Sequence, residues 1–302
     1  MTHHEPRTLR VDVSDVAPAG VRSLAVDVHR PEHVGPRPVV CCCVPGGGMS
    51  RGYFDLQTPA AVGNFSMVGH LVDRGFVVIT LDSPGVGESD VPHDGYTLTP
   101  DVVADVNARA FDQVLEEWPG ARRIGVGHSA GALLTVVQQA RRHTYDALGL
   151  FGFGRGGHAQ FALTEDERDQ AGGIVELTRR RFGDPLPGGG STSTSPFLLG
   201  GMDVPPEALE ALGSVKSRLL GVVGLTSMIP GSVDAEMAAI DVPVFLGIGE
   251  RDIAGDPHAI PACFTGCGDF TLFVLPGTGH NHNVAPDREL LWERFVVWAR
   301  SI

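Results

Sequence analysis

The sequence carries little positive charge. It has 23 lysine and arginine residues against 36 aspartate and glutamate residues, which gives a formal net charge of −13. Nothing in it resembles the basic stripe that nucleic-acid-binding proteins use to contact phosphates, and the negative field would repel a polyanionic substrate. The charge balance therefore excludes nucleic acid and polyanions as expected partners.

Long apolar runs and cysteines are also scarce. No run approaches the roughly 20 apolar residues that cross a membrane, and residues 1–6 lack the charged-then-apolar pattern of a signal peptide. Of the five cysteines, Cys41, Cys42 and Cys43 are consecutive inside an apolar segment. Such a distribution suits a reducing compartment better than a disulfide framework. We expect a cytoplasmic protein without membrane insertion.

The patterns of a metal or phosphate site are incomplete. Cys263 and Cys267 supply two ligands, which is too few for a zinc site, so we expect them to be structural. The glycine run 46–48 is not followed by Gly-Lys-Ser/Thr and does not have the spacing of a dinucleotide fingerprint. We therefore expect neither a metal nor an organic cofactor.

The most informative feature that is present is the pentapeptide Gly-His-Ser-Ala-Gly at residues 127–131. Residues 121–126 before it are strand-like, and residues 132–141 after it have the apolar spacing of a helix. A strand, a tight turn with small residues around a serine, and a helix form the pattern of a nucleophile elbow. The alternative is an ordinary strand-to-helix turn. The context favours the elbow, which would expose the Ser129 hydroxyl above the sheet.

Strand-like and helix-like segments alternate along most of the chain. The predicted strands are residues 9–13, 21–29, 39–44, 76–81, 121–126, 147–153, 242–249 and 270–275, and the first two form an antiparallel pair. The predicted helices are residues 64–74, a helix beginning after Thr99, residues 132–141 and residues 288–302. Such alternation predicts an α/β fold with a mostly parallel sheet and helices on both faces.

This alternation breaks down between residues 154 and 240. Charged helical stretches at 164–170 and 175–181 are followed by a glycine-, serine- and threonine-rich run at 187–195. We therefore assign residues 1–153 and 241–302 to one core and residues 154–240 to an insertion. We expect this insertion to cover the carboxyl ends of the strands, where such sheets bind ligands.

A serine nucleophile needs a base to take its proton and an acid to orient that base. Asp252 follows the predicted strand 242–249, and His280 follows the predicted strand 270–275. The carboxyl ends of parallel strands share one edge of the sheet, so both side chains would converge on Ser129. The chain order Ser129, Asp252, His280 is the order expected of an α/β-hydrolase triad.

Other residues could take these places. Glu250 and Asp256 lie close to Asp252 in sequence, and His282 lies two residues beyond His280. His128 is next to the nucleophile, where a histidine usually packs or lines a pocket. Asp82 is expected to be a turn residue rather than the acid.

Acyl transfer also needs donors for the oxyanion. The backbone N–H of Ala130, directly after the nucleophile, supplies one. The second is expected from the glycine loop, with Gly47 as the first choice and Gly48 as the second. One such donor is worth about 3 kcal/mol in the transition state.

Taken together, these motifs resemble the α/β-hydrolase superfamily over nearly the whole chain. The matching pieces are residues 45–48, the Asp-Ser-Pro-Gly-Val-Gly-Glu-Ser stretch at 82–89, residues 127–131, Asp252 and residues 279–280. The resemblance implies an eight-stranded sheet and a serine hydrolase with a helical cap inserted after the sixth strand, which matches residues 154–240. Many members carry His-Gly before the oxyanion residue, whereas this chain has Pro45-Gly46.

The expected reaction is hydrolysis of a fairly apolar small ester or lactone through an acyl-enzyme. The alternatives are a carbon–carbon bond hydrolase acting on a diketone, a thioesterase or acyltransferase with the same triad, and a non-catalytic receptor on this fold. A homo-oligomer formed through the cap is left open. The candidate pocket residues are Met49, His128, Phe153, Phe161 and Met228.

Overall fold

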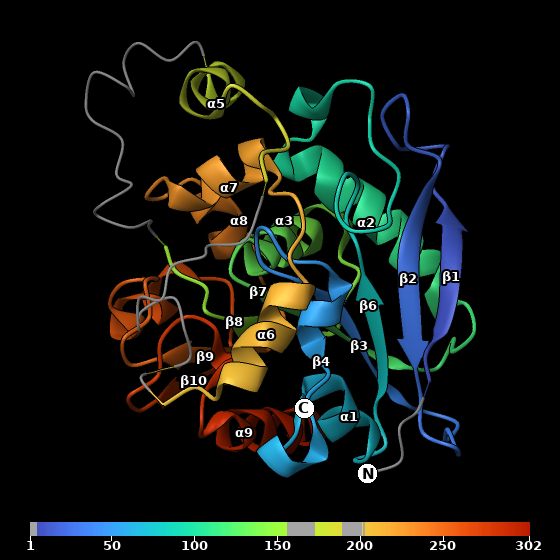
Figure 1. The fold of residues 1–302 in the computed structure, drawn as a ribbon, viewed down its shortest axis with the longest axis vertical. Helices are drawn as coiled ribbons and strands as arrows, with labels where there is room; N and C mark the ends of the chain where they lie inside the picture. The colour runs from blue at the N-terminus through green and yellow to red at the C-terminus, as the bar shows by residue number, and fades with distance from the viewer. Residues whose placement is uncertain (1–4, 156–172, 189–200, 202) are drawn as a thin grey trace.

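The computed structural model describes residues 5–155, 173–188, 201 and 203–302. In this part of the chain one sheet has eight strands, in the order β1-β2-β6-β3-β7-β8-β9-β10 (Figure 1). The strands are β1 Arg7–Asp12, β2 Ser23–His29, β3 Val39–Val44, β6 Val77–Leu81, β7 Arg122–His128, β8 Ala147–Phe151, β9 Val244–Gly249 and β10 Phe270–Leu275. β2 pairs antiparallel with β1 and β6, and the other pairs are parallel. The predicted mostly parallel eight-stranded sheet is confirmed.

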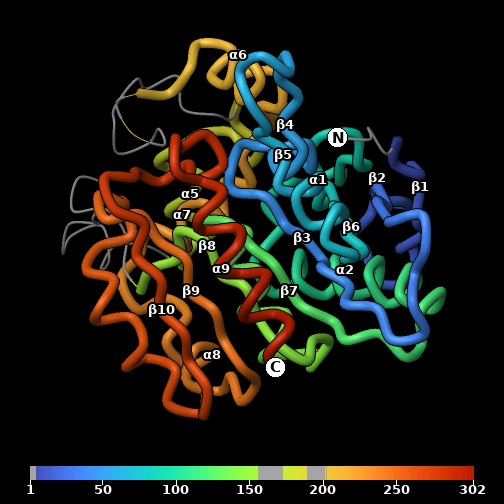
Figure 2. The backbone as a smooth tube through the Cα atoms, turned by 90° about the horizontal axis from the view of Figure 1, so that it is seen from below, coloured from blue at the N-terminus to red at the C-terminus, as the bar shows by residue number. Residues whose placement is uncertain are grey.

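Helices cover both faces of this sheet. On one face lie α2 Pro100–Leu115 and α3 Ala130–Arg142, and on the other α1 Met67–Val72 and α9 Arg288–Ser301, which cross in front of the strands in Figure 2. The packing of strand β3 on both of its faces explains why its sequence is apolar throughout. Cys42 packs in the core beside α2 and α3, whereas Cys41 and Cys43 pack in the core beside α1 and α9. Alternate side chains of a strand point to opposite faces, so a strand covered twice needs no polar positions.

The helix predicted at residues 64–74 is shorter than expected. Phe65–Ser66 forms a short strand, β5, that pairs antiparallel with β4 Asp55–Leu56. The Ser66 hydroxyl then accepts a hydrogen bond from the Gly69 N–H at 2.7 Å and caps α1. This β4–β5 ribbon, which the sequence did not predict, uses the residues that would have formed the first turn.

The chain between β8 and β9 contains α5 Ile174–Phe182, α6 Pro206–Ser214, α7 Gly221–Met228 and α8 Asp234–Ala239. Helix α5 agrees with the helical stretch predicted at 175–181, whereas the stretch predicted at 164–170 lies outside the described residues. The two ends of the segment meet, because Gly231 N–H donates to Arg155 O at 2.9 Å. Met237 of α8 is fully buried in the core beside α3. Helix α8 therefore completes the layer that contains α3.

The state of the cysteines, the grouping of possible metal ligands and the length of the helices can be compared with the expectations from composition. All five cysteines are free, and burial raises the pKa of the Cys41, Cys42 and Cys43 thiols above its ordinary value. Among the described residues no three side chains are grouped as they would be to hold a metal ion. None of the described helices combines the length and apolar character that a membrane crossing requires.

Candidate active site

Ser129 occupies the sharp turn between β7 and α3. Its backbone has φ 53° and ψ −121°, a left-handed conformation that a residue with a side chain rarely adopts. The turn is held by a hydrogen bond from Ser129 N–H to Phe151 O at 2.9 Å on the neighbouring strand. An added Cβ would lie 2.4 Å from Ala132 Cα at Gly127 and 2.2 Å from Val44 O at Gly131. The flanking glycines are therefore required by close packing, as in a nucleophile elbow.

The structure brings Ser129, His280 and Asp252 together. His280 Nε2 lies 2.8 Å from Ser129 Oγ, and His280 Nδ1 lies 2.8 Å from Asp252 Oδ1. The Asp252 side chain is completely buried, and the His280 side chain is 10% exposed. A nucleophile in contact with a base, and that base in contact with a buried acid, form the arrangement that activates a serine hydroxyl.

Asp252 is suited to hold a charge in this buried place. Burial by itself raises the pKa of a carboxyl group, because it penalises the charged form. Here the charge of His280 and the hydrogen bonds from His280 and His282 outweigh burial and hold the pKa of Asp252 far below its ordinary range. Asp252 is therefore a carboxylate at neutral pH and can accept the Nδ1–H of His280.

His282, the alternative base, contacts the acid instead of the nucleophile. Its side chain is 2% exposed, its Nε2 lies 3.1 Å from Asp252 Oδ2, and the Gly249 N–H donates to the same Nε2 at 3.1 Å. Its Nδ1 is buried without a partner among the described residues. With its proton on Nε2, His282 donates to the carboxylate and the Gly249 N–H loses this acceptor; with its proton on Nδ1, Nε2 accepts from Gly249 and cannot donate to the carboxylate.

The acidic alternatives form other contacts. Glu250 Oε2 accepts the Gly277 N–H at 2.7 Å, and Asp256 Oδ1 accepts the His258 N–H at 3.0 Å. The Asp82 carboxylate accepts hydrogen bonds from the backbone and guanidinium of Arg51 and from the Glu88 N–H. The described contacts of these three carboxylates do not include His280. Asp82 is the turn residue that the sequence predicted.

His128 contacts the backbone of His280 and not the Ser129 hydroxyl. It is 3% exposed, its ring stacks on Tyr53 with centroids 4.6 Å apart, and its Nε2 lies 2.9 Å from His280 O. Burial, and next the neighbouring charges of His280 and His282, hold the pKa of His128 well below its ordinary value. A neutral His128 must carry its proton on Nε2, since a carbonyl oxygen can only accept. It therefore holds the backbone of His280.

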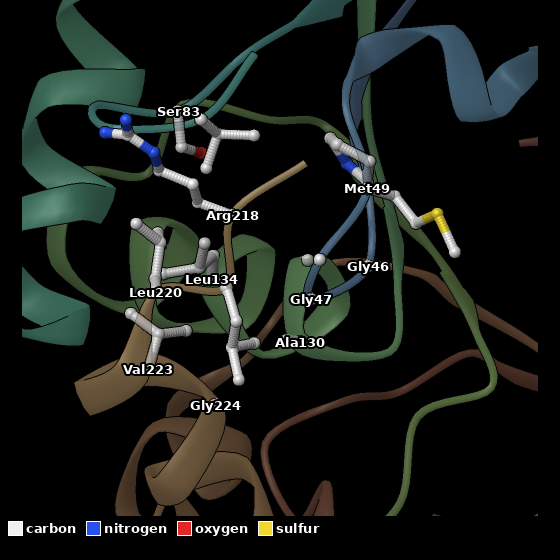
Figure 3. Close-up of a pocket in the computed structure, with 15 residues that line it drawn as sticks. Gly46, Gly47, Met49, Ser83, Ala130, Leu134, Arg218, Leu220, Val223 and Gly224 are labelled. Atoms are coloured by element: carbon white, nitrogen blue, oxygen red, sulfur yellow. The ribbon is translucent and has the colours of Figure 1, made fainter. Parts of the chain in front are cut away.

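A narrow pocket adjoins the elbow, with the glycine loop on one side and α7 on the other (Figure 3). An added Cβ at Gly47 would lie 3.6 Å from Ala130 Cβ, so the two predicted oxyanion residues are neighbours. Within the described chain the Gly47 and Gly48 amides donate to no backbone or side-chain acceptor. Ala130 is the first residue of α3, so its N–H has no acceptor within the helix. Among the described residues, none of these three amides donates a hydrogen bond to a protein acceptor.

Met49 lines this pocket, and it is the only one of the described residues predicted to bind substrate that does so. His128 is behind the triad, Met228 ends α7 away from this pocket wall, and Phe161 lies outside the described residues. Phe153 packs in the core against Phe264, with ring centroids 6.3 Å apart. The wall that the sequence missed includes Ser83, Leu134, Arg218, Val223 and Gly224. Their sequence spacing gives no common signal, because they come from four different segments.

The fold resembles several solved enzymes. It resembles an esterase from Thermogutta terrifontis (malate bound) at 18% identity over 98% of each chain, with a TM-score of 0.65. It resembles a carboxyl esterase from Bacillus coagulans at 15% identity over 100% of this chain and 99% of that one, with a TM-score of 0.68. It also resembles a monoacylglycerol lipase from Paleococcus ferrophilus at 20% identity over 92% of this chain and 98% of that one, with a TM-score of 0.65. At such identities the likeness shows the fold alone.

A sequence comparison with curated proteins gave no match. The sequence profile described as the alpha/beta hydrolase family matches residues 39–291, which is most of the chain and runs from β3 into α9. With this match and the described fold, the chain belongs to the α/β-hydrolase family.

Proposed function

We propose that the protein is a serine hydrolase that cleaves a carboxylic ester or lactone of a fairly apolar small molecule through a covalent acyl-enzyme. The observation that carries the proposal is the continuous contact from Ser129 Oγ through His280 to buried Asp252. Membership of the α/β-hydrolase family supports it. The neighbours named as esterases and a lipase agree with it.

In the first half of the reaction His280 Nε2 takes the proton of Ser129 as Oγ attacks the carbonyl carbon. The carbonyl oxygen becomes an oxyanion, which the N–H groups of Gly47 and Ala130 bind. Asp252 stabilises the imidazolium that forms. The intermediate then collapses to the acyl-enzyme, and His280 gives its proton to the departing alcohol.

In the second half His280 removes a proton from water, and the resulting hydroxide attacks the acyl carbon. A second oxyanion forms in the same place and collapses, which breaks the bond to Ser129 Oγ. The proton on His280 returns to Ser129, and the carboxylic acid leaves. Removal of His280 would therefore block both halves.

We further propose that part of the chain between β8 and β9 acts as a cap that shapes the substrate pocket. Leu220 and Val223, which flank the start of α7, are buried and face the glycine loop across the pocket (Figure 3). Leu134 of α3 adds a third apolar side chain to this wall. Such a wall favours an apolar group beside the scissile bond.

The test is a series of p-nitrophenyl esters from acetate to palmitate, hydrolysed by the wild-type protein and by Ser129→Ala. We expect turnover that peaks at one chain length and is absent in Ser129→Ala, with circular dichroism confirming that the variant is folded. Equal turnover in the folded variant would contradict the proposal. If the wild-type protein does not hydrolyse these esters but reacts covalently with a fluorophosphonate, its serine is active. Lactones and diketones would then be tested as substrates.

A further inference from the structure

The segment that follows α6, residues 215–219, is fixed directly against the glycine loop. Ser50 N–H donates to Val215 O and Ser217 N–H donates to Gly48 O, both at 2.8 Å. The Ser217 hydroxyl accepts the Gly87 N–H at 2.7 Å from the loop that follows β6. Together with the hydrogen bond from the Ser50 hydroxyl to Val215 O at 3.1 Å, these contacts to two loops give the segment a defined position relative to the predicted oxyanion amides.

Two cationic side chains occupy this segment. Lys216 and Arg218 are two residues apart in extended backbone, so their side chains emerge on the same side. Arg218 lines the pocket that contains Gly47 and Ala130, and both cations line a hollow that adjoins it. In Figure 3 the Arg218 side chain extends beside Ser83, on the opposite side of the pocket from Gly47.

Neither cation is neutralised within the described chain. Other arginines near this region have carboxylate partners, since Arg10 pairs with Asp90, and Arg51 pairs with Asp27, Asp82 and Glu88. No described carboxylate lies within ion-pair distance of Lys216 or Arg218, and no acidic residue lines the pocket or the hollow. In a chain with a net charge of −13 this is a local positive site.

We propose that Lys216 and Arg218 bind a carboxylate group carried by the substrate, so that the preferred ester is apolar beside the scissile bond and acidic at its far end. This proposal rests on the proposed function. The guanidinium presents two parallel N–H donors that match a carboxylate, and the ammonium adds a second charge. At physiological ionic strength charges act over roughly 8 Å, so a single carboxylate is attracted here even though the molecule as a whole repels polyanions.

Binding and turnover are measured with two matched ester pairs at low ionic strength. Methyl hexanoate and monomethyl adipate differ by a carboxylate on the acyl side, and butyl acetate and 4-acetoxybutyrate differ by one on the alcohol side. Calorimetry on Ser129→Ala measures binding without turnover. We expect the acidic member of one pair to bind about tenfold more tightly than its neutral partner. Introducing Arg218→Gln or Lys216→Gln into Ser129→Ala should reduce this preference.

The matched control is Arg122→Gln, which removes the same charge from an exposed position at the opposite end of β7 from Ser129. We expect this variant to retain the preference. Equal binding of acidic and neutral esters in both pairs, or a preference that survives in the double variant Lys216→Gln/Arg218→Gln, would overturn the assignment. If the wild-type protein hydrolyses none of the four esters, the proposed function fails for them, while the calorimetric comparison still decides whether this site binds a carboxylate.

Discussion

His282 is the residue whose structural position adds most to what the sequence predicted. In the sequence His282 was the alternative to the predicted base His280. In the structure its Nε2 contacts Oδ2 of Asp252, the oxygen that His280 does not contact. A histidine nitrogen therefore lies near each oxygen of Asp252, His280 Nδ1 at 2.8 Å from Oδ1 and His282 Nε2 at 3.1 Å from Oδ2. A carboxylate fixed in this way keeps the imidazole of His280 directed at Ser129.

Replacing His282 tests this positioning role. We expect His282→Phe to lower kcat by about 10- to 100-fold with little change in KM, because Asp252 loses its polar contact on Oδ2 while the substrate pocket is untouched. His282→Gln, whose amide can donate to the same oxygen, should recover most of the loss. Steady-state kinetics on a neutral ester measure both. If His282→Phe and His282→Gln had the same kcat, the polar contact between residue 282 and Asp252 would be irrelevant to catalysis.

His128 should make stability depend on pH. Burial lowers its pKa, so the folded state keeps it neutral, whereas the unfolded state binds a proton below about pH 6.5. Its contribution to stability is therefore complete above that pH and is lost as the pH falls. Burial lowers the pKa of His29 and His70 in the same direction.

Urea unfolding between pH 8 and pH 5 measures this effect. We expect the free energy of unfolding to fall below pH 6.5 by at most about 1.4 kcal/mol per pH unit for each such histidine. In His128→Gln the slope should be smaller, because one of these groups is gone. An unchanged slope would mean that His128 is protonated in the folded protein.

At the scale of elements, the elbow depends on how closely α3 approaches β3. Gly131 leaves no space for a Cβ, since one would lie 2.2 Å from Val44 O and 2.4 Å from Pro45 O. Both oxygens belong to the backbone and cannot move away cheaply. The packing of α3 against the sheet therefore fixes the position of the nucleophile and of the Ala130 amide.

Gly131→Ala tests this packing. We expect it to lower the free energy of unfolding by about 3 kcal/mol and to reduce turnover sharply, because α3 must shift away from β3. Gly213→Ala is the control, since Gly213 lies in α6 with open space around its Cα. This control should be neutral or stabilising by up to about 1 kcal/mol. Similar losses in the two variants would contradict the account.

Elements were predictable from the sequence where the signal is local. The strands of the sheet and the helix that starts after Thr99 follow from apolar patterns and caps within a few residues. The β4–β5 ribbon has two-residue strands, which are too short to show a period. Arg218 enters the pocket only because hydrogen bonds link residues 215–219 to the distant glycine loop, and no local pattern reports such a contact. Chain order predicted the Ser129, Asp252 and His280 cluster, because parallel strands share one edge.

For the whole molecule, the question is where the proposed cap ends. The sequence placed the boundary at residue 240, which assigns α8 to the cap. The structure packs Met237 of α8 and the adjoining Val233 and Ile240 into the core beside α3. Arg155 and Asp234 form an ion pair at 2.6 Å, so the chain enters and leaves the segment at neighbouring points. Because the chain enters and leaves the segment at these neighbouring points, we propose that the cap ends before α8.

Two deletions compare these boundaries. Replacing residues 157–230 with a short Gly-Ser linker should give a protein that unfolds cooperatively but has lost its chain-length selectivity, because α7 no longer walls the pocket. Replacing residues 157–240 should also remove α8 and expose apolar core, so we expect aggregation or a large loss of stability. Thermal unfolding and size-exclusion chromatography compare the two. Equal behaviour would show that α8 is not part of the core.

The central claim is that Ser129 is an activated nucleophile. The most direct measurement is reaction with a fluorophosphonate, followed by intact-mass and peptide mass spectrometry on the wild-type protein, Ser129→Ala and Asp252→Asn. We predict one adduct per chain, on Ser129, with no adduct in Ser129→Ala and much slower labelling in Asp252→Asn. A folded wild-type protein that does not react, or an adduct on another residue, would contradict the account.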